Sequence, residues 1–181
     1  MATLIREAAP TDIPRILDLV RALATYEREP DAVTATRADF ATALFPSDGA
    51  PTAYGLVGEV DGVVVAMAIW YRTFSTWTGK PGIRLEDLFV AESHRGSGLG
   101  KALLQRLAEI CVERGYPRLE WWVLRWNTPS IEFYDSLGAT PMDEWIDYRV
   151  DGATLVRLGD LGSPAPVTLA HPTTADSGGH R

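Results

Sequence analysis

Three glycines at alternate positions, Gly96, Gly98 and Gly100, stand directly before a run of residues with the apolar spacing of a helix. Glycine lets the backbone adopt positive φ and approach a ligand closely, while the first turn of a helix leaves its N–H groups unpaired. The helix dipole favours an anion at this end, and Arg95 and Lys101 add positive charge on either side of the loop. The segment therefore predicts a phosphate or pyrophosphate site; the alternative is a turn that merely starts a helix.

Neither common nucleotide-binding loop has this spacing. A Walker loop needs four residues between its glycines and Ser or Thr after the Lys, whereas only three residues separate Gly96 from Gly100, and Ala102 follows Lys101. The dinucleotide fingerprint G-x-G-x-x-G belongs near the start of a βαβ chain, but this loop lies in mid-chain and its glycines strictly alternate. The expected ligand therefore carries phosphate but is held by another kind of loop.

Two adjacent carboxylates, Glu86 and Asp87, interrupt an otherwise apolar segment just before the glycine loop. In a regular strand side chains alternate between faces, so Glu86 shares a face with Leu88. By the same rule Asp87 lies on the face of Leu85 and Phe89. A carboxylate among bulky apolar residues is costly in a buried strand unless it is paired or used.

The composition predicts a globular protein with a single folded domain. The chain has 181 residues, of which 46% are hydrophobic, enough to bury one substantial core. The longest apolar run, Val63 to Ile69, is too short to span a membrane, and residues 1–10 lack the apolar core of a signal peptide. We therefore expect a cytoplasmic protein with no membrane partner.

The charge and the metal-binding residue types exclude further classes. A formal net charge of −7 disfavours nucleic acid as a partner and is mildly favourable for a cationic substrate. One cysteine, Cys111, can form no internal disulfide, and the three His residues are scattered, so no metal site is expected.

The expected elements alternate strands, hairpins and helices, which predicts an α/β fold: a mixed, mostly antiparallel sheet flanked by helices, with one parallel crossover. Asp61-Gly62 and Asp151-Gly152 are hairpin signals, and residues 159–181, rich in Gly, Pro, Ser and Thr, predict a flexible tail after a domain of residues 1–158. Strands are expected at 3–7, 52–60, 63–74, 83–91, 118–124, 145–150 and 154–158, and helices at about 12–29, 37–44, 99–114 and 128–137.

The chain has a strand, an R-G-x-G-x-G-K loop, a helix, a second strand, and then an Asn followed by a Tyr-bearing helix. This order resembles the GNAT superfamily of acetyl-CoA-dependent N-acetyltransferases. The superfamily signature is Arg or Gln, two residues, Gly, one residue, then Gly or Ala, and the run from Arg95 to Gly100 satisfies it. The surroundings look like the spermidine/spermine N-acetyltransferase branch over residues 3–158. The segments that carry this likeness are "YE" at 26–27, "LEDLFV" at 85–90, "RGSGLGK" at 95–101 and "WNTPSIEFYDSLGA" at 126–139.

The resemblance implies a GNAT fold with acetyl-CoA lying across the sheet. Its pantetheine is expected to pair with backbone near the end of the LED strand, and its pyrophosphate to lie on the glycine loop. A further segment, at the start of the Tyr-bearing helix, is expected along the other side of the cofactor. The implied cofactor-binding residues are Leu88, Phe89, Val90, Arg95, Gly96, Ser97, Gly98, Leu99, Gly100, Lys101, Asn127, Thr128, Pro129, Ser130 and Tyr134.

The resemblance also implies two catalytic residues. An alkyl amine with a pKa near ~10.4 is mostly protonated at neutral pH, and Glu86 is expected to bind it and accept its proton, directly or through water. The alternative for Glu86 is an ion pair with Arg84 or Arg149. Tyr134 is expected to protonate the leaving thiolate, and its alternative is a core aromatic role. Cys111 is expected to be a packed structural thiol with no acetyl-cysteine role.

The resemblance implies a small cationic acceptor with a primary amine: a polyamine, a diamine or a lysine analogue such as thialysine. Arg125 and Thr128 stand where the polyamine enzymes carry acids. We expect a homodimer, and the open alternatives are acetylation of a protein N-terminus or lysine, and an acetyl-CoA sensor without turnover. The implied substrate-binding residues are Tyr26, Glu27, Glu86, Glu120, Trp121, Trp122 and Asp143, although the two tryptophans also suit strand packing.

Overall fold

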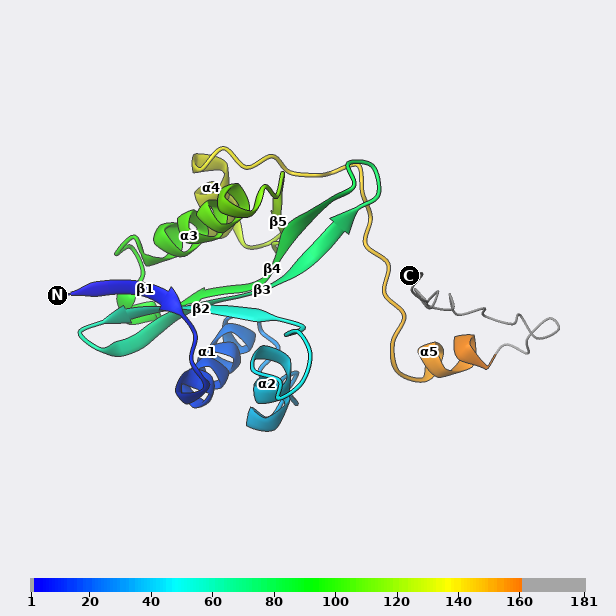
Figure 1. The fold of residues 1–181 in the computed structure, drawn as a ribbon, viewed down its shortest axis with the longest axis horizontal. Coiled ribbons are helices and arrows are strands. Elements are labelled where there is room, and N and C mark those ends of the chain that lie inside the picture. Colours follow the sequence, from blue (N-terminus) through cyan, green and yellow to red (C-terminus); the bar gives the residue numbers. More distant parts are fainter. Residues whose placement is uncertain (1, 161–181) are drawn as a thin grey trace, which may run out of the picture. The chain divides into compact units, whose positions relative to one another are not determined.

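A five-stranded sheet carries the residues of interest in this computed structural model, which describes residues 2–160. The strands lie in sequence order. The pairs β1–β2, β2–β3 and β3–β4 are antiparallel, and the pair β4–β5 is parallel (Figure 1). The predicted mixed sheet with one parallel crossover is confirmed. The strands are β1 (Thr3–Glu7), β2 (Tyr54–Val60), β3 (Val63–Ser75), β4 (Lys80–Val90) and β5 (Leu119–Trp121).

Helices cover both faces of this sheet. On one face lie α1 (Ile13–Tyr26), which follows the short 3-10 helix η1 (Pro10–Asp12), and α2 (Arg37–Leu44). On the other lies α3 (Leu99–Arg114), which connects β4 to β5 after a second 3-10 helix, η2 (Glu92–His94) (Figure 1). The core on the α1 side joins that helix to β2, β3 and the end of β4. It consists of Ile16, Leu19, Val57, Val64, Met67, Ile69 and Phe89.

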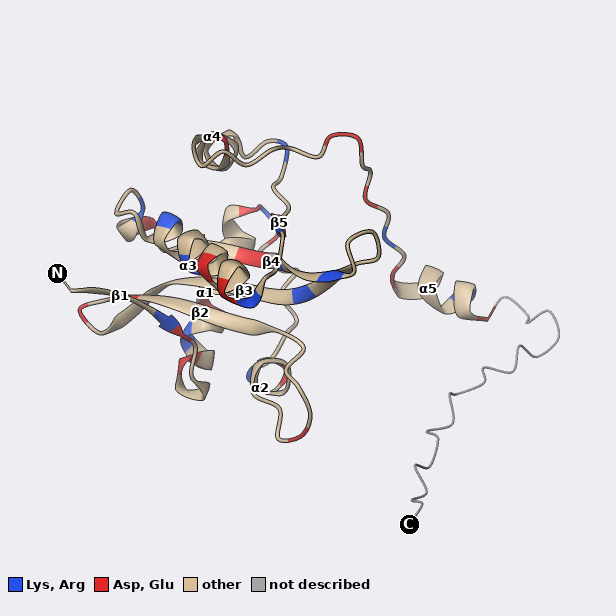
Figure 2. Ribbon diagram, turned by 45° about the horizontal axis from the view of Figure 1, so that its top comes forward, with Lys and Arg blue, Asp and Glu red and all other residues tan. Residues whose placement is uncertain are grey.

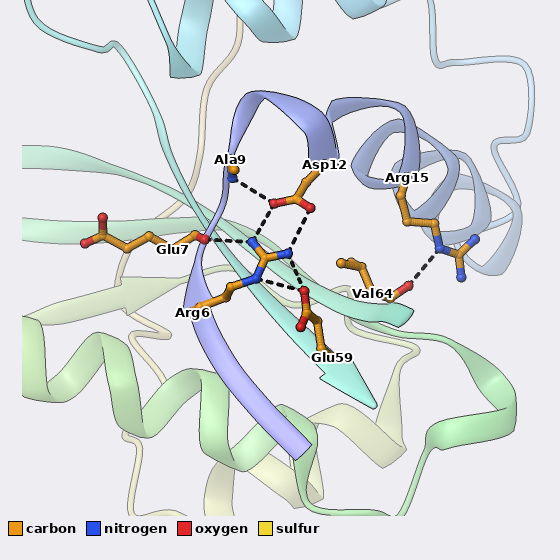
Figure 3. Close-up of polar contacts among 7 residues, drawn as sticks. All are labelled: Arg6, Glu7, Ala9, Asp12, Arg15, Glu59 and Val64. Atoms are coloured by element: carbon orange, nitrogen blue, oxygen red, sulfur yellow. Dashed lines mark hydrogen bonds and ion pairs between the residues drawn. The ribbon is translucent and has the colours of Figure 1, made fainter. Parts of the chain in front are cut away.

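An ionic network fixes the start of α1 against the sheet (Figure 3). The Arg6 guanidinium of β1 donates to both carboxylate oxygens of Asp12, at 2.6 and 2.9 Å, and its Nε donates to Glu59 of β2 at 2.8 Å. Asp12 also accepts from the Ala9 N–H at 2.7 Å, so this carboxylate serves the network and makes no side-chain cap for α1. Its hydrogen bonds to Arg6 lower the pKa of Asp12. Because α1 is one continuous helix, the network also helps to position its other end, which carries Tyr26.

From Glu132 onward the described residues belong to a second unit of the chain. The helix α4 (Thr128–Ser136) ends inside it, and α5 (Gly152–Gly159) follows a stretch without regular structure. The predicted hairpin of strands 145–150 and 154–158 is therefore wrong. Asp151 is the N-cap of α5, and its carbonyl accepts from the N–H groups of Thr154 and Leu155 at 3.1 Å. The predicted tail lies outside the described residues except for positions 159 and 160.

Two strand lengths also differ from expectation. The parallel strand β5 has three residues where seven were predicted, so Trp122 and the two residues after it leave the sheet. Conversely, β4 begins at Lys80, because Ser75 pairs with Lys80 across a turn in a segment that was expected to be a loop. Within residues 2–160 the structure offers no helix with the length and apolar character of a membrane span.

Candidate functional site

A β-bulge at Glu86 changes which side chains share a face of the sheet. Ile69 of β3 is paired with Asp87, but its neighbour Trp70 is paired with Leu85, so Glu86 is an extra residue on β4. Adjacent residues of β3 point to opposite faces, and their partners do the same. Asp87 therefore lies on the face of Ile69, toward α1, whereas Leu85 lies on the opposite face. The predicted common face of Leu85 and Asp87 is wrong, because regular alternation stops at the bulge.

Beyond the bulge, one edge of β4 has no neighbouring strand. The parallel strand β5 pairs with Ile83, Arg84 and Leu85 and extends no further along β4. On the other edge, Leu88 to Val90 remain paired with Ala66 to Ala68 of β3. Within the described part of the chain, no strand pairs with residues 86–90 on this edge, and only the Val90 carbonyl has a side-chain donor, Arg95. The other backbone groups on this edge can bond to another partner. This free edge coincides with the segment expected to pair with pantetheine.

The glycine loop has the backbone geometry that its sequence predicts. Gly96 and Gly98 have φ of 74° and 86°, in the left-handed region that favours glycine. Gly98 is the N-cap of α3, and its carbonyl accepts from the Ala102 N–H at 2.9 Å. Gly100 lies within the first turn of the helix, where N–H groups have no intrahelical partner. Together with the exposed Lys101, this turn forms an anion-binding helix start.

Residues from three parts of the chain meet between the end of α1 and the end of β4. The Arg95 guanidinium lies 4.7 Å from the ring centroid of Tyr26 and 5.5 Å from that of Phe89, and its Nε donates to the Val90 carbonyl at 3.3 Å. The Tyr26 hydroxyl donates to the Asn127 side-chain oxygen at 2.8 Å. Arg95 therefore connects the loop to aromatic rings, a role additional to the expected phosphate contact.

The buried residue Asn127 links α1 to the start of α4. Its side-chain oxygen accepts from Tyr26 and, at 3.4 Å, from the Ser130 N–H, which is the hydrogen bond of a helix cap. Trp126 contacts the Tyr26 ring and lies under the Arg28 guanidinium at 4.6 Å. Arg28 has a φ of 69°, so the chain leaves α1 through a left-handed residue directly after Glu27. These contacts place the predicted residues Tyr26 and Glu27 beside the 126–130 segment.

Three carboxylates, Glu27, Glu86 and Asp87, form an acidic group between the end of α1 and the bulge. Figure 2 shows the acids of β4 as a red band on that strand. Burial raises the pKa of Asp87 to about 6, and the negative charges of Glu86 and Glu27 act in the same direction. Burial also raises the pKa of Glu27. Glu86 itself is exposed, and the structure gives it no ion pair within residues 2–160, so the alternative pair with Arg84 is not formed.

A row of polar residues crosses β3, β4 and β5 on the same face as Asp87. Tyr71 is paired with Arg84, and Arg84 is paired with Glu120. Burial raises the pKa of Tyr71, and the nearby charge of Glu86 raises it further. The Arg84 guanidinium lies 4.3 Å from the ring centroid of Trp122. The predicted residue Glu120 therefore lies on the α1 face of the sheet, and Trp122, which follows β5, contacts Arg84 on that face.

Comparison with known proteins identifies the family of this chain. Residues 13–139 match the model of the Acetyltransferase (GNAT) family. The chain belongs to the GNAT acetyltransferase family. It is therefore an acyltransferase of a family that uses acetyl-CoA as the acetyl donor, as the resemblance implied.

Individual relatives narrow the branch to which this acetyltransferase is similar. It is 35% identical over 164 residues to the thialysine N-epsilon-acetyltransferase of Bos taurus, covering 86% of this chain and 96% of the relative. It is also 35% identical over 164 residues to a Homo sapiens spermidine/spermine N(1)-acetyltransferase-like protein, covering 85% of this chain and 23% of that protein. An integron cassette protein from the mobile metagenome of V. cholerae has a similar structure, with a TM-score of 0.74, 25% identity and coverage of 88% and 99%.

The residues of this acetyltransferase fit the donor on two independent observations. The free edge of β4 offers backbone groups to an amide-bearing chain, and the left-handed glycines and first turn of α3 suit a pyrophosphate. The Ser97 hydroxyl, in contrast, donates to the His94 carbonyl at 2.6 Å and stabilises the turn. Among residues 2–160, no three His, Cys, Asp or Glu side chains gather in a way that could hold a metal ion.

The remaining predicted residues have different placements. Trp121 is half-buried in β5 opposite Leu85. Tyr134, on α4, has its ring 5.3 Å from that of Phe133; it lies with Asp143 in the second unit, and the roles of both stay predictions. Cys111 is buried and its thiol donates to the Arg118 carbonyl at 3.6 Å, which matches the expected structural role.

Sequence reasoning gave no role to Asp87 or Tyr71, and it considered Arg84 only as an ion-pair partner of Glu86. Regular alternation placed Asp87 correctly with Phe89 but wrongly with Leu85, and the shift that corrects it belongs to the pairing of two strands. Tyr71 and Arg84 carry no motif, and only the cross-strand register places them beside the acidic group. The sequence could have suggested their positions only through the predicted strand boundaries and an assumed antiparallel register between residues 63–74 and 83–91.

Proposed function

We propose that this acetyltransferase transfers the acetyl group of acetyl-CoA directly to the primary amine of a small cationic substrate, a diamine, polyamine or lysine analogue. The observation that carries this proposal is the acidic group of Glu27, Glu86 and Asp87, which lies at the start of the free edge of β4. Carboxylates close together attract an ammonium ion and can remove its proton. The names of the similar proteins, which describe acetylation of thialysine and of spermidine or spermine, support the same substrate class.

We assign the two adjacent carboxylates different tasks. Glu86 is exposed on the bulge and suits the first contact with the incoming ammonium group. Asp87 is half-buried, and its pKa of about 6 is close to the value that an efficient general base needs near neutral pH. The sequence gave both tasks to Glu86. We propose that Glu86 binds the amine and that the Asp87 carboxylate accepts its proton.

The donor is held, in this proposal, by the backbone of Leu88, Phe89 and Val90 and by the loop from Arg95 to Lys101. Acetyl-CoA, when bound, supplies an acetyl thioester that an unprotonated amine attacks. Arg95 serves two purposes, because its ring contacts with Tyr26 and Phe89 also fix the loop to the end of α1. Residues 127–130 are proposed to lie along the donor, with the buried Asn127 positioning that segment through its bond to Tyr26.

Tyr134 is proposed as the residue that donates a proton to the departing sulfur. Its phenol is protonated at neutral pH and can act as a general acid, and α4 begins directly after the capping residue Asn127. Glu27, Glu120, Trp121, Trp122 and Asp143 are proposed to line the acceptor site. Of these, Glu27 and Trp122 have the strongest support, from the acidic group and from the contact with Arg84.

We further propose that the protein acts as a cytoplasmic homodimer. Large apolar side chains in the second unit are exposed to solvent within one chain, which supports a partner for them. They lie in the stretch before α5 and on α5 itself: Met142, Trp145, Ile146, Tyr148, Leu155, Val156 and Leu158. Sedimentation at several protein concentrations tests the dimer, and a monomer at all of them would refute it.

Release of free thiol from acetyl-CoA tests the function. The acceptor panel contains spermidine, a diamine, thialysine, an aminoglycoside and a lysine-bearing peptide, each assayed with wild type, Tyr134→Phe, Glu86→Gln and Asp87→Asn. We expect turnover with the small amines, a loss of about 10²- to 10⁴-fold in kcat for Tyr134→Phe, and an acid limb near pH 6 that Asp87→Asn lacks and Glu86→Gln retains.

Three results would contradict the proposal. Turnover of the peptide alone would favour a protein acetyltransferase. Binding of acetyl-CoA without turnover of any acceptor would favour the sensor. Full activity of Tyr134→Phe at every pH would remove the general-acid role from that residue.

A further inference from the structure

Arg84 is a cation inside a region otherwise suited to binding cations. It lies in the middle of the row Tyr71, Arg84, Glu120, which crosses three strands on the α1 face of the sheet. Its guanidinium lies over the ring of Trp122, 4.3 Å from the centroid. Neither the family signature nor the proposed acetyl transfer accounts for an arginine at this position.

The carboxylate that lies across the strands from Arg84 is paired with another cation. Glu120, its cross-strand neighbour, forms an ion pair with Arg118, whose Nε lies 3.1 Å from the Glu120 oxygen. In the part of the chain that the structure describes, Arg84 has a ring contact and no ion pair. A guanidinium stacked on an aromatic ring keeps the N–H groups at its edge available, and their fork geometry matches a carboxylate.

The position of Arg84 relative to Asp87 suits a substrate with two charged ends. Both lie on the α1 face, and their partners on β3, Tyr71 and Ile69, are two residues apart. Two residues of strand correspond to about 7 Å, which a lysine-length side chain can bridge. The acidic group would hold the terminal amine, while a second ammonium at the other end of a diamine would meet a cation.

We propose that Arg84 binds the carboxylate of the acceptor, so that the site selects amino acids with a terminal side-chain amine over diamines and polyamines. This inference rests on the proposed function and names a narrower substrate class for the same site. Arg84 is thereby a specificity-determining residue. Trp122 positions it by holding the plane of the guanidinium.

Matched acceptors test the inference, since L-lysine, L-lysine amide and pentane-1,5-diamine share one chain and differ in the group at one end. Acetylation of the terminal amine is measured with wild type, Arg84→Gln, Arg84→Lys and the control Arg72→Gln. Arg72 is exposed on β3 and pairs with Ile83, so it lies on the opposite face of the sheet. Its replacement removes the same charge from the neighbouring strand.

Wild type is expected to prefer L-lysine over the amide and the diamine. Arg84→Gln is expected to lower kcat/KM for L-lysine by about 10- to 100-fold, mainly through KM, and to leave the diamine unchanged or improved. Arg84→Lys is expected to recover part of the loss, and Arg72→Gln to behave as wild type. Thermal unfolding of each variant, measured without acceptor, checks that the fold is intact.

Other outcomes separate this inference from the proposed function. An equal loss for L-lysine and the diamine in Arg84→Gln, or a wild-type preference for the diamine, would overturn the carboxylate-binding role while leaving amine acetylation in place. If wild type acetylates none of the three acceptors and no other small amine, the proposed function itself fails, and this inference fails with it.

Discussion

Replacing Asp87 by Asn is expected to stabilise the fold at neutral pH and to remove activity. The pKa of Asp87 is about 6 in the fold against an ordinary value of 3.8, so the folded state binds this proton more tightly than the unfolded chain does. The free energy of unfolding therefore falls as the pH rises between these two values. Above them, the ionised carboxylate costs about 3 kcal/mol, which the uncharged Asn does not incur.

Urea unfolding followed by Trp fluorescence measures this difference across the pH range. Asp87→Asn is expected to exceed wild type by about 2 to 3 kcal/mol near pH 8 and to match it within about 0.5 kcal/mol near pH 4. Glu86→Gln is the control, because this neighbouring carboxylate is exposed and its replacement is expected to change stability by less than about 1 kcal/mol. An Asn variant with no gain near pH 8, or with an equal gain at both pH values, would refute the burial argument.

Catalysis gives the same variant a second readout. If Asp87 accepts the proton of the amine, Asp87→Asn is expected to lose about 10²- to 10⁴-fold in kcat/KM although it is more stable than wild type. A variant that gains stability and loses activity is expected when the replaced residue carries a charge that the reaction needs and that destabilises the fold. A stable variant with full activity would leave proton acceptance to Glu86.

Two further predictions concern the framework around the site. Asp12→Asn removes the carboxylate that Arg6 holds, and we expect a loss of about 1 to 3 kcal/mol near pH 7. Because the hydrogen bonds to Arg6 lower the pKa of Asp12, this stabilisation is present above its ordinary value of 3.8 and lost as the pH falls through the lowered one, so urea unfolding near pH 3 is expected to show a smaller gap. Gly98→Ala is expected to cost about 1 to 2 kcal/mol and to weaken acetyl-CoA binding in calorimetry, because its φ of 86° strains any side chain although no atom lies within 4 Å of the added Cβ. Gly100→Ala, inside the first turn of α3, is the matched control, and equal effects of both changes would contradict the role of backbone conformation.

The sequence predicted most of the fold because its local signals agree with one another. Asp61-Gly62 marks the β2–β3 hairpin, and both residues have the positive φ that such a turn requires. Gly115 ends α3 in the left-handed region, as its place after the last apolar position predicted. These elements are decided by patterns within a few residues, and tertiary packing did not override them.

The prediction failed where a short apolar run had two compatible periods. The segment from Thr154 to Leu158 alternates well enough for a strand, but Leu155 and Leu158 are also three residues apart, which is a helical spacing. Asp151, which was taken as the first residue of a hairpin turn, has an extended backbone and caps α5. The same residue type serves both structures, so the sequence alone could not separate them.

The candidate site was predictable in its glycine loop and less so in its carboxylates, and the difference lies in the bulge at Glu86. In a regular strand Asp87 would share the face of Leu85, which packs away from α1 and is almost fully buried, and a charge there would have no partner. The extra residue turns Asp87 to the α1 face, beside Glu27 and the row that contains Arg84. The bulge lies directly after the last pair with β5, so the strand changes face at the same point where its edge becomes free. One inserted residue thus divides β4 into two parts. The first part stabilises the sheet, and the second can bind the acetyl donor along its edge and the amine substrate on its face.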